Sequence, residues 1–231
     1  MKERLLSAIA SARAREAELE DLSVDEPADP AGRYHAKDHL AHMAWWRARS
    51  ADLIEAVRTG DQPPPSVESE VQNAVTYEEN RDRAADGVKR DARASWEELT
   101  EAILACSEED LLKPHPHAAG SALWGIVPSD AGHLGVHLMF LHLDAGDEER
   151  AASAARWGYE VETSFFEKPA DRADATYNLA CFYARVGRSE DALPLLRQSF
   201  EAKPALIDLA RRDPDLDSIR DDPRLKELLA T

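Results

Sequence analysis

The segment AKDHLAHMAWWRARSADLIEAVRT, residues 36 to 59, carries the pattern from which the fold can be predicted. Its larger residues recur at steps of three or four, which places them on one face of an α-helix. This face consists of Met43, Trp46, Ser50, Leu53 and Val57. Gly60 and the prolines at 63 to 65 follow directly, and such residues end helices. We therefore predict one long amphipathic helix over residues 36 to 59.

Helical periodicity extends over most of the chain. Ala, Leu, Glu and Arg are abundant and runs of β-branched residues are few, so the composition favours helix over strand. Further helices are expected over residues 2–20, 66–106, 131–143, 151–166, 174–186 and 189–202. We predict an all-α protein in which an up-down four-helix bundle, residues 1–150, precedes a smaller helical module, residues 151–231.

Two of the predicted helices have distinctive features. The helix over 66–106 is largely polar, and we expect it to break near Gly87. The stretch LLKPHPHAAG, residues 111–120, is expected to be a loop because of its prolines and its glycine, and Pro128 lies near the start of the next helix. From Ala131 to Leu143 that helix is apolar nearly all round, which predicts burial on every side.

The charge of the chain restricts its partners. The formal net charge is −17; residues 1–150 hold 16 Lys and Arg against 30 Asp and Glu, and residues 151–231 hold 12 against 15. An acidic surface repels phosphate backbones and anionic lipid, so neither nucleic acid nor a membrane is an expected partner. The chain has no stretch of the ~18 apolar residues that span a bilayer and no signal-peptide core. Cys106 and Cys181 match no disulfide framework, so we expect a cytoplasmic protein.

Residues 175 to 204, ATYNLACFYARVGRSEDALPLLRQSFEAKP, resemble one tetratricopeptide repeat. The characteristic small and large positions are occupied by Leu179, Ala180, Tyr183, Ala192 and Pro204. A single repeat does not bury a continuous core, since a stable array normally needs about three. The flanking helices are therefore expected to act as caps. The module is either a groove that binds a protein partner or dimerises, or a structural appendage of the bundle.

The histidines are clustered. His133 and His137 are four residues apart, so on a helix their side chains lie one turn apart on the same face and can reach a single ion. A third imidazole from another helix would complete a set of three nitrogen donors, which suits zinc, nickel or iron and leaves a coordination position open. His39 and His42 both border the apolar face of the helix at 36–59, and periodicity does not choose between them. The alternative is a pair of buried, hydrogen-bonded core histidines.

Three segments resemble the DinB-like four-helix bundles, and in particular their ClbS/DfsB branch. They are YHAKDHLAHMAWW at 34–46, YEENRDR at 77–83 and ALWGIVPSDAGHLGVH at 122–137, and the resemblance spans roughly residues 1–145. In that superfamily one histidine of the second helix and two of the fourth bind a divalent metal, often in dimers. The resemblance thus implies His42, His133 and His137 as metal ligands.

The chain departs from this pattern around the histidines. Leu134, Gly135, Val136 and Leu138 stand where the ClbS-like proteins have polar and charged residues, and Tyr34 replaces a usual tryptophan. These departures imply a more apolar pocket, which fits either a different substrate or a site that no longer does chemistry.

The resemblance implies a divalent-metal-dependent hydrolase or thiol transferase that acts on a small electrophilic molecule, with a homodimer as a candidate assembly. The metal would act as a Lewis acid. No general base stands out from the sequence; the candidates are Glu78, Glu79, Asn80, His117 and His142. The alternative from another class is a non-enzymatic binding or scaffold protein whose repeat module recruits a partner, and a purely structural role is the third hypothesis.

Overall fold

The computed structural model of the protein describes residues 1–27, 29, 33–118 and 120–230. Over these residues the chain is all-helical and contains no strand. It divides into two compact units, Met1–Leu134 and Gly135–Thr231, and the division falls within one helix, α6 (Ile126–Asp144). The prediction of an all-α protein is confirmed, whereas a domain boundary near residue 150 stays a prediction.

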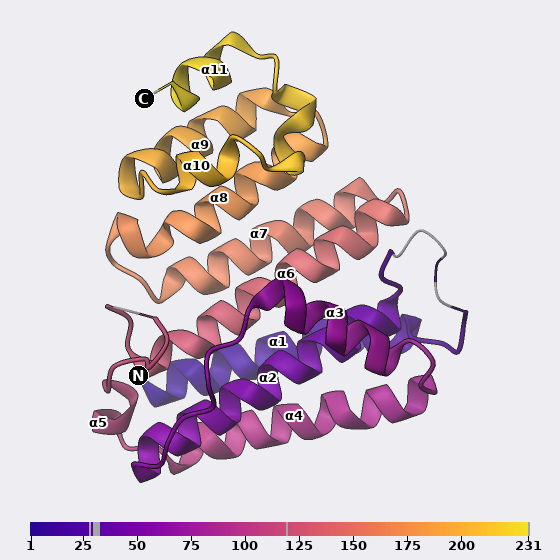
Figure 1. Ribbon diagram of the computed structural model, residues 1–231, viewed down its shortest axis with the longest axis vertical. Helices are drawn as coiled ribbons and strands as arrows, with labels where there is room; N and C mark the ends of the chain where they lie inside the picture. The colour runs from indigo at the N-terminus through magenta and orange to yellow at the C-terminus, as the bar shows by residue number, and fades with distance from the viewer. Residues whose placement is uncertain (28, 30–32, 119, 231) are drawn as a thin grey trace. The chain divides into compact units, whose positions relative to one another are not determined.

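The first unit is built on three long helices that pack against one another: α1 (Lys2–Leu22), α2 (Ala36–Thr59) and α4 (Ala85–Ala105). Figure 1 shows α2 next to α4, and α2 also contacts the shorter α3 (Ser69–Asn80). Their buried apolar residues form the core and include Leu5, Ile9, Leu19, Leu40, Met43, Ile54, Leu99 and Ile103. The helix predicted over residues 36 to 59 is α2, and the core of this unit forms around it.

A buried ion pair joins the three long helices. Glu16 on α1 interrupts an apolar face in the sequence, and in the structure it is fully buried. Arg47 of α2 donates two hydrogen bonds to the Glu16 carboxylate, at 2.7 and 2.8 Å, and Trp96 of α4 donates a third, at 2.7 Å. The Arg47 guanidinium also lies 3.8 Å from the centre of the Trp96 ring. Removing one partner of such a pair typically costs about 3 to 5 kcal/mol, because the other charge stays buried.

The polar segment after α2 forms two helices, and the break lies earlier than predicted. α3 ends at Asn80 and α4 begins at Ala85, whereas Gly87 lies within the first turn of α4. The buried Lys37 ammonium of α2 donates hydrogen bonds to the carbonyl oxygens of Arg81 and Arg83, at 2.7 and 3.1 Å. These carbonyls follow the end of α3, so a side chain from another helix stabilises the break.

Helix α6 begins at Ile126, directly after the short 3₁₀ helix η1 (Leu123–Gly125), and the four-residue α5 (Glu108–Leu111) precedes both. Pro128 therefore lies in the first turn of α6, where its missing N–H costs little. Burial on every side is confirmed only in part. Leu134 and Leu138 are buried, whereas Val136 and Phe140 are half-buried.

In the second unit, α7 (Glu148–Ser164) packs on α8 (Pro169–Arg185), which packs on α9 (Ser189–Ala202). The turn between α8 and α9 contains Gly187 with φ of +72°, a conformation that glycine adopts readily. Ala180 and Ala192 are completely buried, so the two helices approach closely there.

Three short helices complete this unit: α10 (Leu206–Ala210), the 3₁₀ helix η2 (Pro214–Ile219) and α11 (Pro223–Leu229). η2 contacts α8, and α10 and α11 contact α9. They cover the helical pair with apolar side chains, and their role as caps of a repeat stays a prediction. The buried residues are Leu206, Ala210, Leu216, Ile219 and Leu225.

Among the described residues, no helix has both the length and the hydrophobicity needed to cross a membrane.

Candidate metal centre

The structure brings the three histidines of the predicted ligand set together. His42 lies on α2, and His133 and His137 lie one turn apart on α6. One ring nitrogen of each histidine lies within 4.8 Å of the others. The Nε2 atoms of His42 and His133 are 3.4 Å apart, and their rings meet edge to face with centroids 5.1 Å apart.

The distance between these two nitrogens fits a shared ion better than a hydrogen bond. N–H donors in proteins normally lie within about 3.2 Å of their acceptors. Two imidazole nitrogens that both bind a tetrahedral zinc ion at 2.0 to 2.1 Å are themselves about 3.3 Å apart. Only one proton can lie between His42 Nε2 and His133 Nε2, so at least one of them offers a lone pair. Three imidazoles within 4.8 Å of one another, two of them 3.4 Å apart, therefore fit a divalent transition metal.

The surroundings of the cluster favour the neutral form of its imidazoles. His42 is buried, and His133 and His137 are half-buried. Burial lowers the pKa of His42 to about 3, with a further contribution from the nearby His133, and burial lowers the pKa of His133 to about 4. Deprotonated nitrogen is the form that binds a metal, so these two rings are ready for coordination at neutral pH.

The position of His42 is set at the start of α2. The backbone N–H of His35 donates to the Asp38 carboxylate at 2.9 Å, and the two residues form a capping box. Lys37, the residue before Asp38, is bonded to the carbonyls beyond α3 as described above. The Lys-Asp pair within YHAKDHLAH therefore fixes the first turn of α2, about one turn before His42.

Aromatic side chains surround His42. The Tyr34 ring lies edge-on to it at a centroid distance of 6.2 Å, and Trp46 lies 6.3 Å away on the same helix. Tyr77 of α3 stacks on Tyr34 at 5.3 Å with an interplanar angle of 6°. Asn73, also on α3, accepts a hydrogen bond from Trp46 Nε1 at 3.0 Å. α3 is thus attached to α2 at the level of the histidine.

A close helix crossing explains the glycine between the two α6 histidines. A Cβ atom added to Gly135 would lie 2.7 Å from the Cα of Gly158 and 3.1 Å from the carbonyl oxygen of Ala154, both on α7. Gly135 is two residues from each histidine, which on an α-helix is about 200° of rotation. α7 therefore packs on the face of α6 opposite His133 and His137, and the apolar departure at Gly135 has a packing cause.

The polar residues considered as general bases on α3 do not assemble at the cluster. Glu78 and Glu79 are exposed. Asn80 is buried, its amide nitrogen donates to the Thr76 carbonyl at 2.7 Å, and its amide oxygen accepts from Arg83 at 2.7 Å. Both polar ends of the Asn80 side chain are therefore hydrogen-bonded to groups near the end of α3.

The remaining candidate histidines lie outside the triad. His117 is exposed, and its Nε2 lies 2.7 Å from the carbonyl oxygen of Pro64. His142 is buried on α6. His39, which periodicity left open as a ligand, is buried with its ring 5.4 Å from that of Tyr34, but it is not part of the triad. None of these contacts identifies His117 or His142 as the general base.

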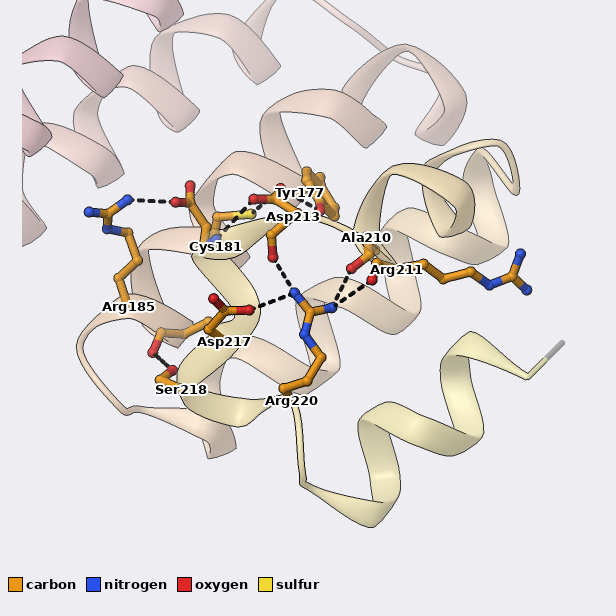
Figure 2. Close-up of polar contacts among 11 residues, drawn as sticks. Tyr177, Cys181, Arg185, Ala210, Arg211, Asp213, Asp217, Ser218 and Arg220 are labelled. Carbon is orange, nitrogen blue, oxygen red and sulfur yellow. Dashed lines mark hydrogen bonds and ion pairs between the residues drawn. The ribbon is translucent and has the colours of Figure 1, made fainter.

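The sequence did not predict a second cluster, in the other unit. Cys181 of α8 and the carboxylates of Asp213 and Asp215 bring three potential ligand atoms within 4.8 Å. Figure 2 shows the contacts among these residues. Tyr177 donates a hydrogen bond to Asp213 Oδ2 at 2.7 Å, and Cys181 Sγ lies 3.8 Å from the same oxygen.

Protein donors already occupy the carboxylates of this second cluster. Asp213 Oδ1 accepts from the backbone N–H of Asp215 at 3.0 Å and so caps η2, while Arg185 forms an ion pair with Asp215. Burial raises the pKa of the Cys181 thiol above its usual range, and Asp213 adds to this effect. Since thiolate is the metal-binding form of cysteine, the cluster is better described as a clasp that holds η2 on α8. Its only sequence signal was the position of Cys181 one helical turn after Tyr177.

Comparison of the chain with protein-family models, with curated proteins and with solved structures gives no match.

Proposed function

We propose that this protein is a divalent-metal-dependent hydrolase or thiol transferase that acts on a small electrophilic molecule. One observation carries the proposal: three imidazoles meet within 4.8 Å, with two of their nitrogens at the spacing of ligands on one ion. Three protein ligands leave a coordination position for substrate, as in catalytic zinc sites, whereas closed structural sites use four.

In this proposal His42, His133 and His137 hold the ion, which is zinc, nickel or iron. When bound, such an ion supplies Lewis-acid activation of water or of a thiol. The chain contributes the rest. The capping box at His35 and Asp38 orients the first turn of α2, and the rings of Tyr34 and Trp46 restrict the access of bulk water to His42.

We also propose which helices correspond to the families that the sequence resembles. Helices α1, α2, α4 and α6 would form a DinB-like four-helix bundle, and α8 with α9 would form one tetratricopeptide-like unit. The mutual packing of α1, α2 and α4 supports the first correspondence, and the burial of Ala180 and Ala192 between α8 and α9 supports the second.

Elemental analysis of protein purified without a histidine tag tests the proposal. We expect about one transition metal per chain in the wild type and a loss of that metal in His42→Ala, His133→Ala and His137→Ala, as three-ligand coordination requires. His117→Ala is the matched control, because this exposed histidine lies outside the triad, and we expect it to keep the metal. A metal-loaded wild type is then screened with thiols and small electrophiles.

Two results would contradict the proposal. The first is a wild-type chain that contains no metal and takes up neither zinc nor nickel nor iron. The second is metal content that survives all three substitutions. Either result would favour a non-enzymatic binding protein with three core histidines.

A further inference from the structure

The surroundings of His42 indicate what kind of molecule the site receives. Tyr34, Trp46 and Tyr77 are all half-buried, and the first two lie next to His42. Tyr34 and Trp46 have their ring centroids at 6.2 and 6.3 Å from that of His42, and Tyr77 supports Tyr34 from behind by parallel stacking. We call Tyr34 and Trp46 the aromatic wall.

Trp46 of the aromatic wall is bonded to α3. Its Nε1 donates to the side-chain oxygen of Asn73 at 3.0 Å, and the Tyr34 hydroxyl lies 3.4 Å from the backbone oxygen of the same residue. The bond to Asn73 holds the Trp46 ring in position and uses its only N–H donor.

We infer that the substrate held at the triad carries an aromatic ring, which packs against Tyr34 and Trp46 while its sulfur or oxygen atom reaches the metal position. This inference rests on the proposed function. Aromatic rings attract one another through edge-to-face and offset contacts, beyond the burial of apolar area. Each such contact is worth about two- to tenfold in affinity.

Binding of thiol probes to the Co²⁺-loaded protein tests the inference. Co²⁺ reports on its own ligands by its visible spectrum, and a thiol that gives up its proton and binds through sulfur adds a charge-transfer band whose growth gives an affinity. The probes are phenylmethanethiol and cyclohexylmethanethiol, which has a similar size but no aromatic ring. We expect phenylmethanethiol to bind at least about fivefold more tightly than cyclohexylmethanethiol.

Three substitutions locate the preference. Trp46→Leu and Tyr34→Leu each remove a ring, so we expect the ratio of the two neutral-thiol affinities to fall by about two- to tenfold. Tyr34→Phe keeps the ring and should keep the ratio. Trp45→Leu is the matched control, because Trp45 is an equally half-buried neighbour that contacts Trp46 and Arg49, and it should leave the ratio unchanged.

The outcomes separate the inference from the proposed function. If Co²⁺ does not bind, both are overturned. If Co²⁺ binds with the spectrum of a nitrogen-ligated ion but the two thiols bind equally, the inference alone is overturned. A preference for phenylmethanethiol that survives both Trp46→Leu and Tyr34→Leu, with the Co²⁺ spectrum intact, overturns the aromatic wall as its cause.

Discussion

Two groups of side chains in the described part of the chain bring three ligand-type atoms within 4.8 Å, and they differ in what holds them in place. His42, His133 and His137 face one another through ring nitrogens, with 3.4 Å between His42 Nε2 and His133 Nε2. In the other group, Asp213 and Asp215 accept hydrogen bonds and an ion pair from groups of the protein itself.

The difference shows that proximity of donors is a weak sign of a metal site. The carboxylates of Asp213 and Asp215 accept from Tyr177, from a backbone N–H and from Arg185, so their negative charge is compensated. A cation would have to displace these partners. Imidazoles kept neutral by burial have little charge to compensate, and two of them lie too far apart for a normal hydrogen bond. This difference supports our proposal that a metal binds at the histidines, whereas the second group contributes to stability.

The largest effect is expected from metal binding itself. Zinc at about a thousand times its dissociation constant should stabilise the wild type by about 4 kcal/mol, because it binds only the folded chain. His137→Ala should abolish this stabilisation, while Cys181→Ala should retain it in full. Thermal unfolding with and without zinc measures the difference. If zinc stabilises His137→Ala but not Cys181→Ala, the metal binds at the second group and our proposal is wrong.

Substitutions in the second group should lower stability and leave metal binding unchanged. Asp213→Ala removes the acceptor of the Tyr177 hydroxyl and the cap of η2, so we expect a loss of about 2 to 4 kcal/mol with unchanged metal content. Asp217→Ala, on the same 3₁₀ helix but exposed, should cost less than about 0.5 kcal/mol. Urea unfolding followed by circular dichroism checks both. Equal costs for the two variants would mean that the clasp contributes nothing.

A smaller effect is expected at the crossing of α6 and α7. Gly135→Ala places a methyl group against the backbone of Gly158, so α6 must shift, at a cost of about 1 to 3 kcal/mol. Because the two α6 ligands lie on the opposite face at the same level, we also expect about a tenfold loss of zinc affinity, the scale of effects from groups that orient ligands.

Gly125→Ala provides the control for this crossing, since a Cβ atom there meets nothing within 4 Å. A Gly135→Ala protein that is destabilised but binds zinc as the wild type does would show that α7 supports the fold without positioning the ligands.

The last prediction concerns pH. With pKa values near 3 and 4, His42 and His133 of the metal-free protein should remain neutral at pH 5, where an ordinary histidine with a pKa near 6.5 is protonated. The unfolded chain takes up these protons near pH 6.5, so stability should fall as the pH decreases from about 6.5 towards 4. Ring-nitrogen NMR shifts of the histidines measure the first effect, and ordinary titration near pH 6.5 would contradict it.

Helix positions were predictable from the sequence because they follow local periodicity, and the features that were missed depend on partners far along the chain. The spacing of His133 and His137 predicted a shared helix face, but only the family resemblance chose His42 over His39. Glu16 was visible as an interruption of an apolar face, and its partner Arg47 comes from another helix. The break after Asn80 was expected near Gly87, because nothing local shows that Lys37 bonds to the carbonyls of Arg81 and Arg83.

X-ray absorption spectroscopy at the zinc edge tests the central claim most directly, because the two groups differ in the element that contacts the metal. The account predicts about three nitrogen neighbours at 2.0 to 2.1 Å with the scattering pattern of imidazole rings, and no sulfur. A sulfur neighbour at about 2.3 Å, accompanied by oxygen and without imidazole scattering, would place the ion at Cys181, Asp213 and Asp215 and would contradict the account.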